Sequence, residues 1–447
     1  MSSPAKKADH LAVLVHGLWG HPKHLDYLRD TLQKQYPTDR LHVLVATTLS
    51  DNKTYDGADV GGERVANEIE EEIAKLKEDG YDIMKISMVG YSFGGLISRY
   101  AIGLLYSSGL FERVKPINFT TFATPHLGVR TPKRGWRSTL FNSMGPRTLS
   151  TSGQQMFLVD SFRETGRPLL SVLSDPNSIF MKGLDTFKNK WLYANTINDR
   201  SVPWYTAAWS RTDPFVELDK IELHYLDPQP PPGEVILKPN SGFVTPKRSP
   251  YENMTFFERL KTIPHRALSN LPFYILLATL MPIFLPAFLL NSGYQTYQSA
   301  QRIAAHNSGK VFKPEKYRVK FLEDAEAVQD RLYERFTNRQ REEYLPTPPP
   351  ERAEEDKSSA EQSPERPDLR LSRRESARER AHDFKILALT EEQFDMIENL
   401  DKLGFEKYPV HIQKVRHTHA AIVVRMQKDS FVEGKAVVQH WAEKFEL

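Results

Sequence analysis

The stretch GYSFGG, residues 90–95, decides which fold this sequence predicts. It comes directly after a strand-like run, Lys85–Val89, and directly before an apolar stretch of helical character that starts at Leu96. A serine in a tight strand-to-helix turn is held with its hydroxyl exposed, and the turn closes only when the residues two before and two after it are very small. The pattern therefore predicts Ser92 as an exposed nucleophile; the alternative is a glycine-rich turn with an idle serine.

A regular alternation of strand-like and helix-like stretches surrounds this turn. Apolar residues recur at helical spacing in 24–35, in 63–77 and after Leu96, and short apolar runs flank each of these stretches. Strands that alternate with helices in this way form a mostly parallel sheet with helices on both faces. The sequence therefore predicts an α/β fold, with strands that include 11–15, 41–45, 85–89 and 118–122.

The overall composition excludes several classes of protein. The 447 residues include 60 Lys and Arg and 57 Asp and Glu, and the resulting net charge of +3 argues against a nucleic-acid-binding protein. The chain has 0 cysteines, which excludes disulfides, a thiol nucleophile and Cys-ligated zinc or iron–sulfur sites. A mean hydropathy of -0.51 indicates that part of the chain is not packed into a core.

Changes in composition divide the chain into segments. Proline-rich stretches cannot hold a helix or a central strand, and a stretch with many prolines, dense charge and few apolar residues cannot bury enough surface to fold. The predicted segments are an N-terminal core part (1–210) with a helical insertion (131–189), an irregular Pro-rich segment (211–270), an apolar segment (271–290), a charged helical segment (291–344), a disordered linker (345–380) and a C-terminal core part that carries the catalytic histidine (381–447).

A serine nucleophile needs a base and an acid that orients the base. For a serine in a strand–turn–helix, the expected order along the chain is serine, acid, histidine, and the acid follows a late strand. Asp199 meets this condition, because it follows the strand-like run 191–197. Asp213 and Asp160 are weaker candidates, because neither follows a clear strand. We therefore predict Asp199 as the acid, with an ordinary turn residue as the alternative.

The base is expected in a loop after the final strand, which we place at 410–415. The sequence Arg-His-Thr-His at 416–419 occupies that loop. His419 is preferred because it leads directly into an apolar, helix-like stretch that would fix its position, and His417 is the second choice. His411 lies within the strand, where a packed position is expected. The remaining alternative is that neither loop histidine is catalytic.

Backbone N–H groups that stabilise a developing negative charge are expected from two loops. One donor is the residue after the nucleophile, Phe93. The other is expected after an early strand, where HGLWG at 16–20 follows the run 11–15, and Leu18 is the predicted donor. We interpret His16 and His126 as structural residues close to these loops.

Five motifs together resemble the serine esterase (lipase-like) family of the α/β-hydrolase superfamily: HGLWG (16–20), GYSFGG (90–95), ATPHLG (123–128), NDRSVP (198–203) and HTHAAI (417–422). The resemblance covers 11–209 and 384–441, and the layout is similar to that of fungal lipid-droplet phospholipases. It implies an α/β-hydrolase fold and the hydrolysis of lipid esters, glycerophospholipids in particular, at droplet surfaces. It agrees with a triad of Ser92, His419 and Asp199, which needs no metal or cofactor.

The uncharged segment 271–290 is about as long as a membrane-spanning helix. It lies between Asp199 and His419 in the chain, so a single crossing would place the acid and the base on opposite sides of the membrane. Pro282 and Pro286 would permit a bend, and basic residues flank both ends, which predicts that both ends face the cytosol. We therefore predict a hairpin in a membrane or lipid monolayer, an interfacial segment, or a buried segment or lid.

The combined expectation is a phospholipase at the lipid droplet, with a further pool at the endoplasmic reticulum membrane and with the catalytic part facing the cytosol. The expected partners are a phospholipid or neutral-lipid substrate and a lipid monolayer or membrane surface, and no nucleic acid. Three alternatives stay open: a triacylglycerol lipase, an acyltransferase, and a catalytically idle hydrolase-fold scaffold at lipid surfaces.

Overall fold

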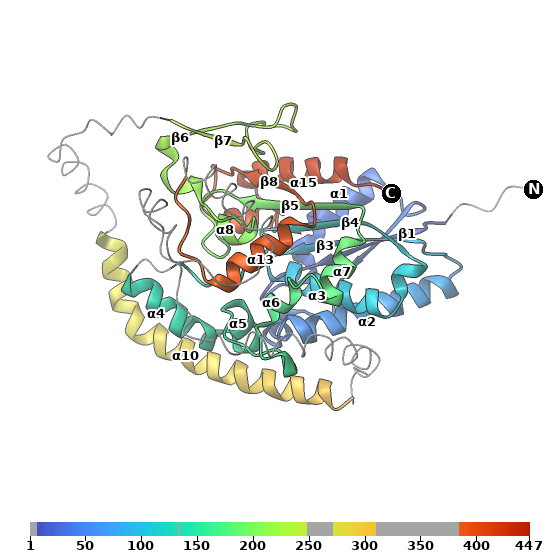
Figure 1. Ribbon diagram of the computed structural model, residues 1–447, viewed down its shortest axis with the longest axis horizontal. Coiled ribbons are helices and arrows are strands. Elements are labelled where there is room, and N and C mark those ends of the chain that lie inside the picture. Colours follow the sequence, from blue (N-terminus) through green and yellow to red (C-terminus); the bar gives the residue numbers. More distant parts are fainter. Residues whose placement is uncertain (1–6, 133–134, 248–270, 310–383) are drawn as a thin grey trace, which may run out of the picture.

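The computed structural model describes residues 7–132, 135–247, 271–309 and 384–447 (Figure 1). The predicted disordered linker at 345–380 and most of the predicted charged segment at 291–344 lie outside the described residues, as does the end of the Pro-rich segment.

A six-stranded parallel sheet forms the centre of the molecule (Figure 1). Its strand order is β2-β1-β3-β4-β5-β8, and every neighbouring pair runs parallel. The strands are β1 (His10–Val15), β2 (Leu41–Val45), β3 (Lys85–Tyr91), β4 (Lys115–Phe122), β5 (Asn189–Asn195) and β8 (Glu406–Val410). The predicted α/β class with a mostly parallel sheet is confirmed.

Helices cover both faces of this sheet (Figure 1). One face carries α2 (Ala58–Glu78), α3 (Phe93–Ser107) and α7 (Ile179–Asp185), and the other carries α1 (Asp26–Gln35) and α15 (Val432–Lys444). Two apolar clusters result. Along β1, Leu11 and Val13 belong to one cluster and Ala12 and Leu14 to the other, because successive side chains of a strand point to opposite faces.

The direction of strand addition reverses at β1, which lies between β2 and β3. In open parallel sheets, ligands bind beyond the carboxyl ends of the strands at such a switch point. The loop 16–20 follows β1 and Ser92 follows β3, so both lie at this place. Asp199 and His419 come after β5 and β8, at the same carboxyl edge. The topology therefore gathers the predicted site residues on one side of the sheet.

Short elements surround the core. The region between β4 and β5, which the sequence analysis interpreted as a helical insertion, contains four short helices: α4 (Trp136–Met144), α5 (Ser150–Met156), α6 (Leu169–Leu173) and α7. After α8 (Trp204–Ala207), β6 (Ile221–Leu223) and β7 (Val244–Pro246) pair antiparallel. Ile236 bridges to Val410 and so partly covers the free edge of β8. The chain re-enters the core through α13 (Glu391–Asp401), ahead of β8.

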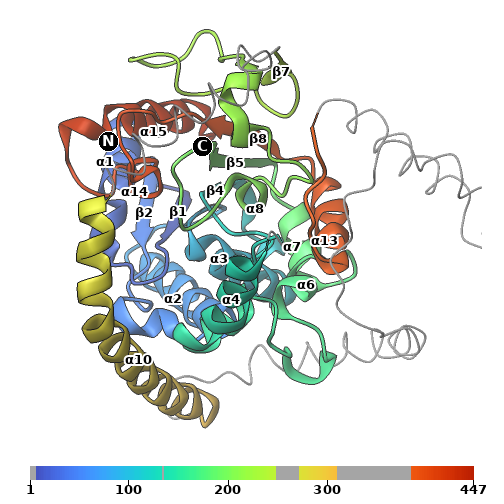
Figure 2. The ribbon, with the colours of Figure 1, turned by 90° about the vertical axis from the view of Figure 1, so that its left-hand side faces the viewer.

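One long helix, α10 (Leu271–Asn307), runs along the outside of the molecule (Figures 1 and 2). It includes 271–290, so the hairpin predicted there is wrong, and Pro282 and Pro286 do not turn the chain back. A proline inside a helix removes one hydrogen bond and bends the axis, and a long helix continues through it when its other bonds remain. The roles of an interfacial segment or a lid stay predictions. Among the described residues, none of the helices combines the length and apolar character needed to cross a bilayer.

Candidate active site

Ser92 occupies a strained turn between β3 and α3. Its φ is 56° and its ψ is -130°, in a region that residues with a side chain rarely adopt. A Cβ at position 90 would lie 2.3 Å from the Gly95 Cα, and a Cβ at position 94 would lie 2.3 Å from the Val15 carbonyl oxygen. Only glycine fits at these two positions, which is the physical reason for the pattern that the sequence shows around Ser92.

His419 links Ser92 to Asp199. Its Nε2 lies 3.0 Å from the Ser92 Oγ, and its Nδ1 lies 2.8 Å from the Asp199 Oδ2. The Asp199 side chain is 2% exposed and the His419 side chain 18% exposed. His417, the second candidate, is exposed at the start of α14 (Thr418–Ala421). The structure therefore brings together the three residues preferred from the sequence, and His417 is not part of the hydrogen bonds that link them.

The carboxylate of Asp199 is fully used as a hydrogen-bond acceptor. Its Oδ1 accepts the backbone N–H groups of Ser201 and Val202, at 3.0 and 2.8 Å. Its Oδ2 accepts both the His419 ring and the side-chain amide of Asn195, the latter at 2.8 Å. These bonds fix the carboxylate so that it can orient the imidazole. Sequence reasoning missed Asn195, although its place as the last residue of β5 puts it four residues before the acid.

The other two acidic candidates serve local structure. Asp213 accepts the Phe215 N–H at 3.1 Å at the start of a 3₁₀ helix. Asp160 accepts the Leu169 N–H at 2.9 Å, and burial raises the pKa of this carboxyl to about 6. The carboxylate partner of His419 is Asp199.

Two further residues position His419. The Tyr91 hydroxyl donates to the His419 backbone oxygen at 2.9 Å, and the two rings lie 5.2 Å apart. Burial raises the pKa of Tyr91 and keeps this hydroxyl protonated as a donor. The buried Thr418 donates its hydroxyl to the Ile197 carbonyl oxygen at 2.9 Å, which ties the histidine loop to the loop that carries Asp199. The motif at 90–95 contains Tyr91, but only the fold shows what its hydroxyl contacts.

The loop 16–20 lies directly against the nucleophile. A Cβ at Gly17 would be 2.6 Å from the Ser92 Cβ and 3.1 Å from its Oγ, so the backbone of this loop approaches Ser92 as closely as glycine allows. Leu18 packs against the apolar core. Phe93 is the first residue of α3, and the first N–H groups of a helix have no partner within it. The position of both segments agrees with the predicted oxyanion donors, and the role of Leu18 and Phe93 stays a prediction.

His16 and His126 are buried, as the sequence analysis expected of structural residues. The His16 Nδ1 lies 3.1 Å from the Gly17 carbonyl oxygen, and burial lowers the pKa of the ring. His126 lies between the Thr121 hydroxyl, at 3.0 Å, and the buried Arg99 guanidinium, at 3.4 Å. Burial and the Arg99 charge lower the pKa of His126 well below its usual value, so it stays neutral in the folded protein.

Comparison with known proteins shows that residues 5–212 match the family described as "Putative serine esterase (DUF676)". "Putative lipase ROG1" of Saccharomyces cerevisiae is 37% identical over 46% of this chain and 29% of its own length. "Putative lipase YDL109C" of the same yeast is 33% identical over 44% of this chain and 30% of its own length. The chain thus spans about three tenths of the length of these relatives. The resemblance to serine esterases that the motifs predicted is confirmed for residues 5–212.

Two solved structures that match part of the chain are described as a phospholipase and as an α/β-hydrolase fold protein. Phospholipase PlaB from Legionella pneumophila covers 44% of this chain and 41% of its own, with a TM-score of 0.27 and 15% identity. An α/β-hydrolase fold protein from Nakamurella multipartita covers 46% of this chain and 80% of its own, with a TM-score of 0.24 and 12% identity.

Proposed function

We propose that this protein, whose residues 5–212 match the serine esterase family, is a serine hydrolase of lipid esters and specifically a phospholipase. The observation that carries the proposal is the series of hydrogen bonds from Asp199 through His419 to Ser92. An oxygen nucleophile, a base and an orienting carboxylate at these distances are the groups that acyl transfer requires. The relatives described as lipases support a lipid ester as the substrate.

In the proposed reaction, the Ser92 Oγ attacks the ester carbonyl carbon while the His419 Nε2 takes the hydroxyl proton. The N–H groups of Leu18 and Phe93 stabilise the negative oxygen of the tetrahedral intermediate. His419 then donates the proton to the leaving alcohol, and an acyl group remains on Ser92. Water, deprotonated by His419, attacks this acyl group and releases the fatty acid. Throughout, Asp199 holds the Nδ1–H and stabilises the imidazolium.

Helix α10 lies on the outside of the molecule (Figure 2), and its exposed side chains support a lipid surface as the place of action. Leu290, Tyr294 and Tyr297 are 77%, 59% and 62% exposed, and their spacing of four and three residues places them on one face of the helix. The face that carries Ser292 and Ser299 is buried against the body of the protein. This is the reverse of an ordinary surface helix, whose apolar face covers the core. An outward apolar stripe fits insertion into the boundary between lipid headgroups and acyl chains.

The proposed orientation follows from the triad itself. Asp199 and His419 come from either side of α10 in the chain and yet are 2.8 Å apart. Both flanks of α10 therefore have to be on the same side of any lipid layer, which agrees with an interfacial helix and not with a single membrane crossing. A phospholipid monolayer around a lipid droplet, approached from the cytosol, satisfies this condition, and we propose it as the site of action.

Replacing the most exposed apolar residue of this stripe, Leu290, is expected to weaken binding to lipid without slowing ester hydrolysis. Burial of one leucine side chain contributes about 1.5–3 kcal/mol, so Leu290→Asn should lower partitioning onto phosphatidylcholine vesicles at least about tenfold. Hydrolysis of a short, water-soluble ester should be unchanged. Vesicle co-flotation and ester turnover measure the two effects. Gln301→Asn, at an exposed polar position of the same helix, is the matched control, and equal flotation of both variants would contradict the lipid contact.

The substrate class is tested with purified wild-type protein on mixed emulsions of phospholipid and triacylglycerol, together with an added acyl acceptor alcohol. We expect free fatty acid and lysophospholipid, and a fluorophosphonate adduct on the peptide that contains Ser92. Release from triacylglycerol alone would overturn the choice of phospholipid. A labelled ester of the added alcohol would indicate acyl transfer. If the protein forms no product and no adduct, the enzyme proposal is wrong and the fold serves as an idle scaffold.

A further inference from the structure

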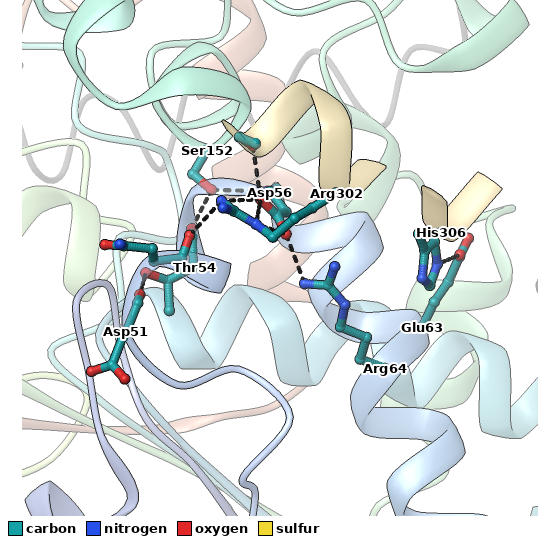
Figure 3. Close-up of polar contacts among 11 residues, drawn as sticks. Asp51, Thr54, Asp56, Glu63, Arg64, Ser152, Arg302 and His306 are labelled. Carbon is teal, nitrogen blue, oxygen red and sulfur yellow. Dashed lines mark hydrogen bonds and ion pairs between the residues drawn. The ribbon is translucent and has the colours of Figure 1, made fainter. Parts of the chain in front are cut away.

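Helix α10 is docked on the body of the protein through polar side chains (Figure 3). The Ser292 hydroxyl donates to the Thr148 carbonyl oxygen at 2.9 Å, and the His306 Nε2 lies 2.7 Å from the Glu63 Oε2. Both Glu63 and His306 are buried. Contacts of this kind, deep in the interface and spread along the helix, fix α10 in one position relative to the core.

The centre of this interface is the buried carboxylate of Asp56. Its side chain is 0% exposed, and Arg302 of α10 holds it through Nε, at 3.1 Å from both oxygens, and through a terminal nitrogen at 2.8 Å. The Ser299 hydroxyl donates to the same carboxylate at 2.8 Å, and Arg64 of the core pairs with it at 2.9 Å. Arg302 also donates to the Asn52 carbonyl oxygen at 2.8 Å. The helix thus holds the segment 51–56 from outside.

The segment 51–56 contacts the predicted oxyanion loop on its other side. It contains the 3₁₀ helix η2 (Asp51–Tyr55), and the Thr54 hydroxyl accepts the Trp19 backbone N–H at 3.0 Å. The Asp51 backbone N–H donates to the Gly20 carbonyl oxygen at 3.0 Å. Trp19 has a φ of 53°, an unfavourable conformation for a side chain of this size, which needs such external support.

We infer that α10 positions the oxyanion loop of the esterase site, through Arg302, the segment 51–56 and Thr54. The inference rests on the proposed function. It adds a role in that function for α10, which lies outside the 5–212 match to the esterase family. Arg302 and Thr54 are positioning residues. They touch neither the nucleophile nor the base, and they act through the loop whose Gly17 lies against Ser92.

Geometry explains why this coupling affects the reaction and not only stability. An oxyanion donor acts only when it lies at hydrogen-bond distance from the developing charge, so a displacement of about 1 Å can reduce the rate by up to about 100-fold. The loss of Arg302 leaves Asp56 paired with Arg64 and Ser299, so the carboxylate is not left as an unpaired buried charge. The protein is therefore expected to fold without Arg302, with a less restrained segment 51–56.

The test compares Arg302→Met and Thr54→Val in the full chain, on a short soluble ester that does not require a lipid surface. Each change should lower kcat about tenfold with KM unchanged, because the oxyanion forms only in the transition state. The double variant should be no more than slightly worse than either single one, since both act through the same contact. Thr54→Ser, which retains the hydroxyl, should restore kcat.

Arg167→Met is the matched control. The Arg167 side chain is 23% exposed and pairs with Asp175 at 2.6 Å, which resembles the ion pair of Arg302 with Asp56. Among the described residues, the hydrogen bonds of Arg167 and Asp175 do not lead to the loop 16–20. This variant should lose stability without loss of kcat. Unchanged kcat in Arg302→Met below its unfolding temperature would overturn the inference, as would additive losses in the double variant or an equal loss in Arg167→Met.

Hydrogen exchange separates this inference from the proposed function. The Trp19 amide is protected by Thr54, so Arg302→Met and Thr54→Val should each raise amide exchange in the peptide that covers 16–20, by about tenfold, whereas Arg167→Met should not. This measurement needs no turnover. A wild-type protein without esterase activity would end the proposed function while the exchange result still reports the coupling, and unchanged exchange in the first two variants would refute the coupling itself.

Discussion

Replacing Ser92 by alanine is expected to lower kcat for ester hydrolysis by about 10⁶-fold, as happens when a serine nucleophile is removed from a complete triad. The physical reason is that the Ser92 Oγ lies 3.0 Å from the His419 Nε2, on a strained turn that exposes the hydroxyl to the site. Without this hydroxyl no acyl-enzyme can form, and only polarisation by the remaining site accelerates the attack of water. Fatty acid release from phospholipid vesicles measures the loss.

The Ser92→Ala variant should also resist a fluorophosphonate probe, and its thermal unfolding should be close to that of the wild type. Ser108→Ala is the control. Its hydroxyl donates to the Leu105 carbonyl oxygen at the far end of α3, away from the nucleophile, and this variant should retain full turnover and labelling. If Ser92→Ala released fatty acid at a rate near that of the wild type, Ser92 would not be the nucleophile.

Removal of the His419 imidazole should reduce kcat nearly as much as removal of the serine, again by about 10⁶-fold. Alanine at 419 leaves the Ser92 hydroxyl with no base within reach, and it leaves Asp199 without the group that it orients. His417→Ala, two residues away and exposed, should keep kcat within about twofold, because the surface position touches neither Ser92 nor Asp199. Burst and steady-state kinetics on a chromogenic ester distinguish the two variants.

The double variant Ser92→Ala with His419→Ala provides a second readout. The two residues act as one unit, so the double variant should be no slower than Ser92→Ala alone. A strong loss in His417→Ala together with a mild one in His419→Ala would reverse the assignment of the base. Equal losses in both histidine variants, with lowered unfolding temperatures, would indicate that the loop 416–419 had been disturbed and not the base removed.

Much of the site could be predicted because its signals are local. The glycines around Ser92 report a turn in which a Cβ has no room, and this constraint can be read without the fold. Asp199 and His419 each follow a strand, and a parallel sheet brings the carboxyl ends of its strands to one edge. The preference for His419 over His417 rested on the apolar stretch that follows it. In the structure, residues 421–424, at the end of α14 and directly after it, are buried.

The residues that the sequence did not reveal depend on contacts between distant segments. Asn195 is one of many polar strand residues until the fold brings its amide to the Asp199 carboxylate. Thr418 binds the Ile197 backbone across 221 positions of sequence, a pairing that no spacing rule predicts. The hairpin at 271–290 was wrong for a related reason. Proline and hydropathy patterns describe the segment alone, whereas in the structure it belongs to a longer helix whose later part, from Ser292 to His306, binds the core.

By itself, the sequence determined the fold class and predicted Ser92 as the nucleophile and the order of the triad, because strand periodicity, glycine at sterically closed positions and loop placement after strands are properties of short stretches. Only the tertiary structure decided that α10 is one helix whose polar side chains at 292, 299, 302 and 306 face the core, and that Arg302 reaches the segment beside the predicted oxyanion loop. The reason is physical: a buried carboxylate such as Asp56 needs positive charge nearby, but which of many arginines supplies that charge depends on the packing of segments about 246 residues apart.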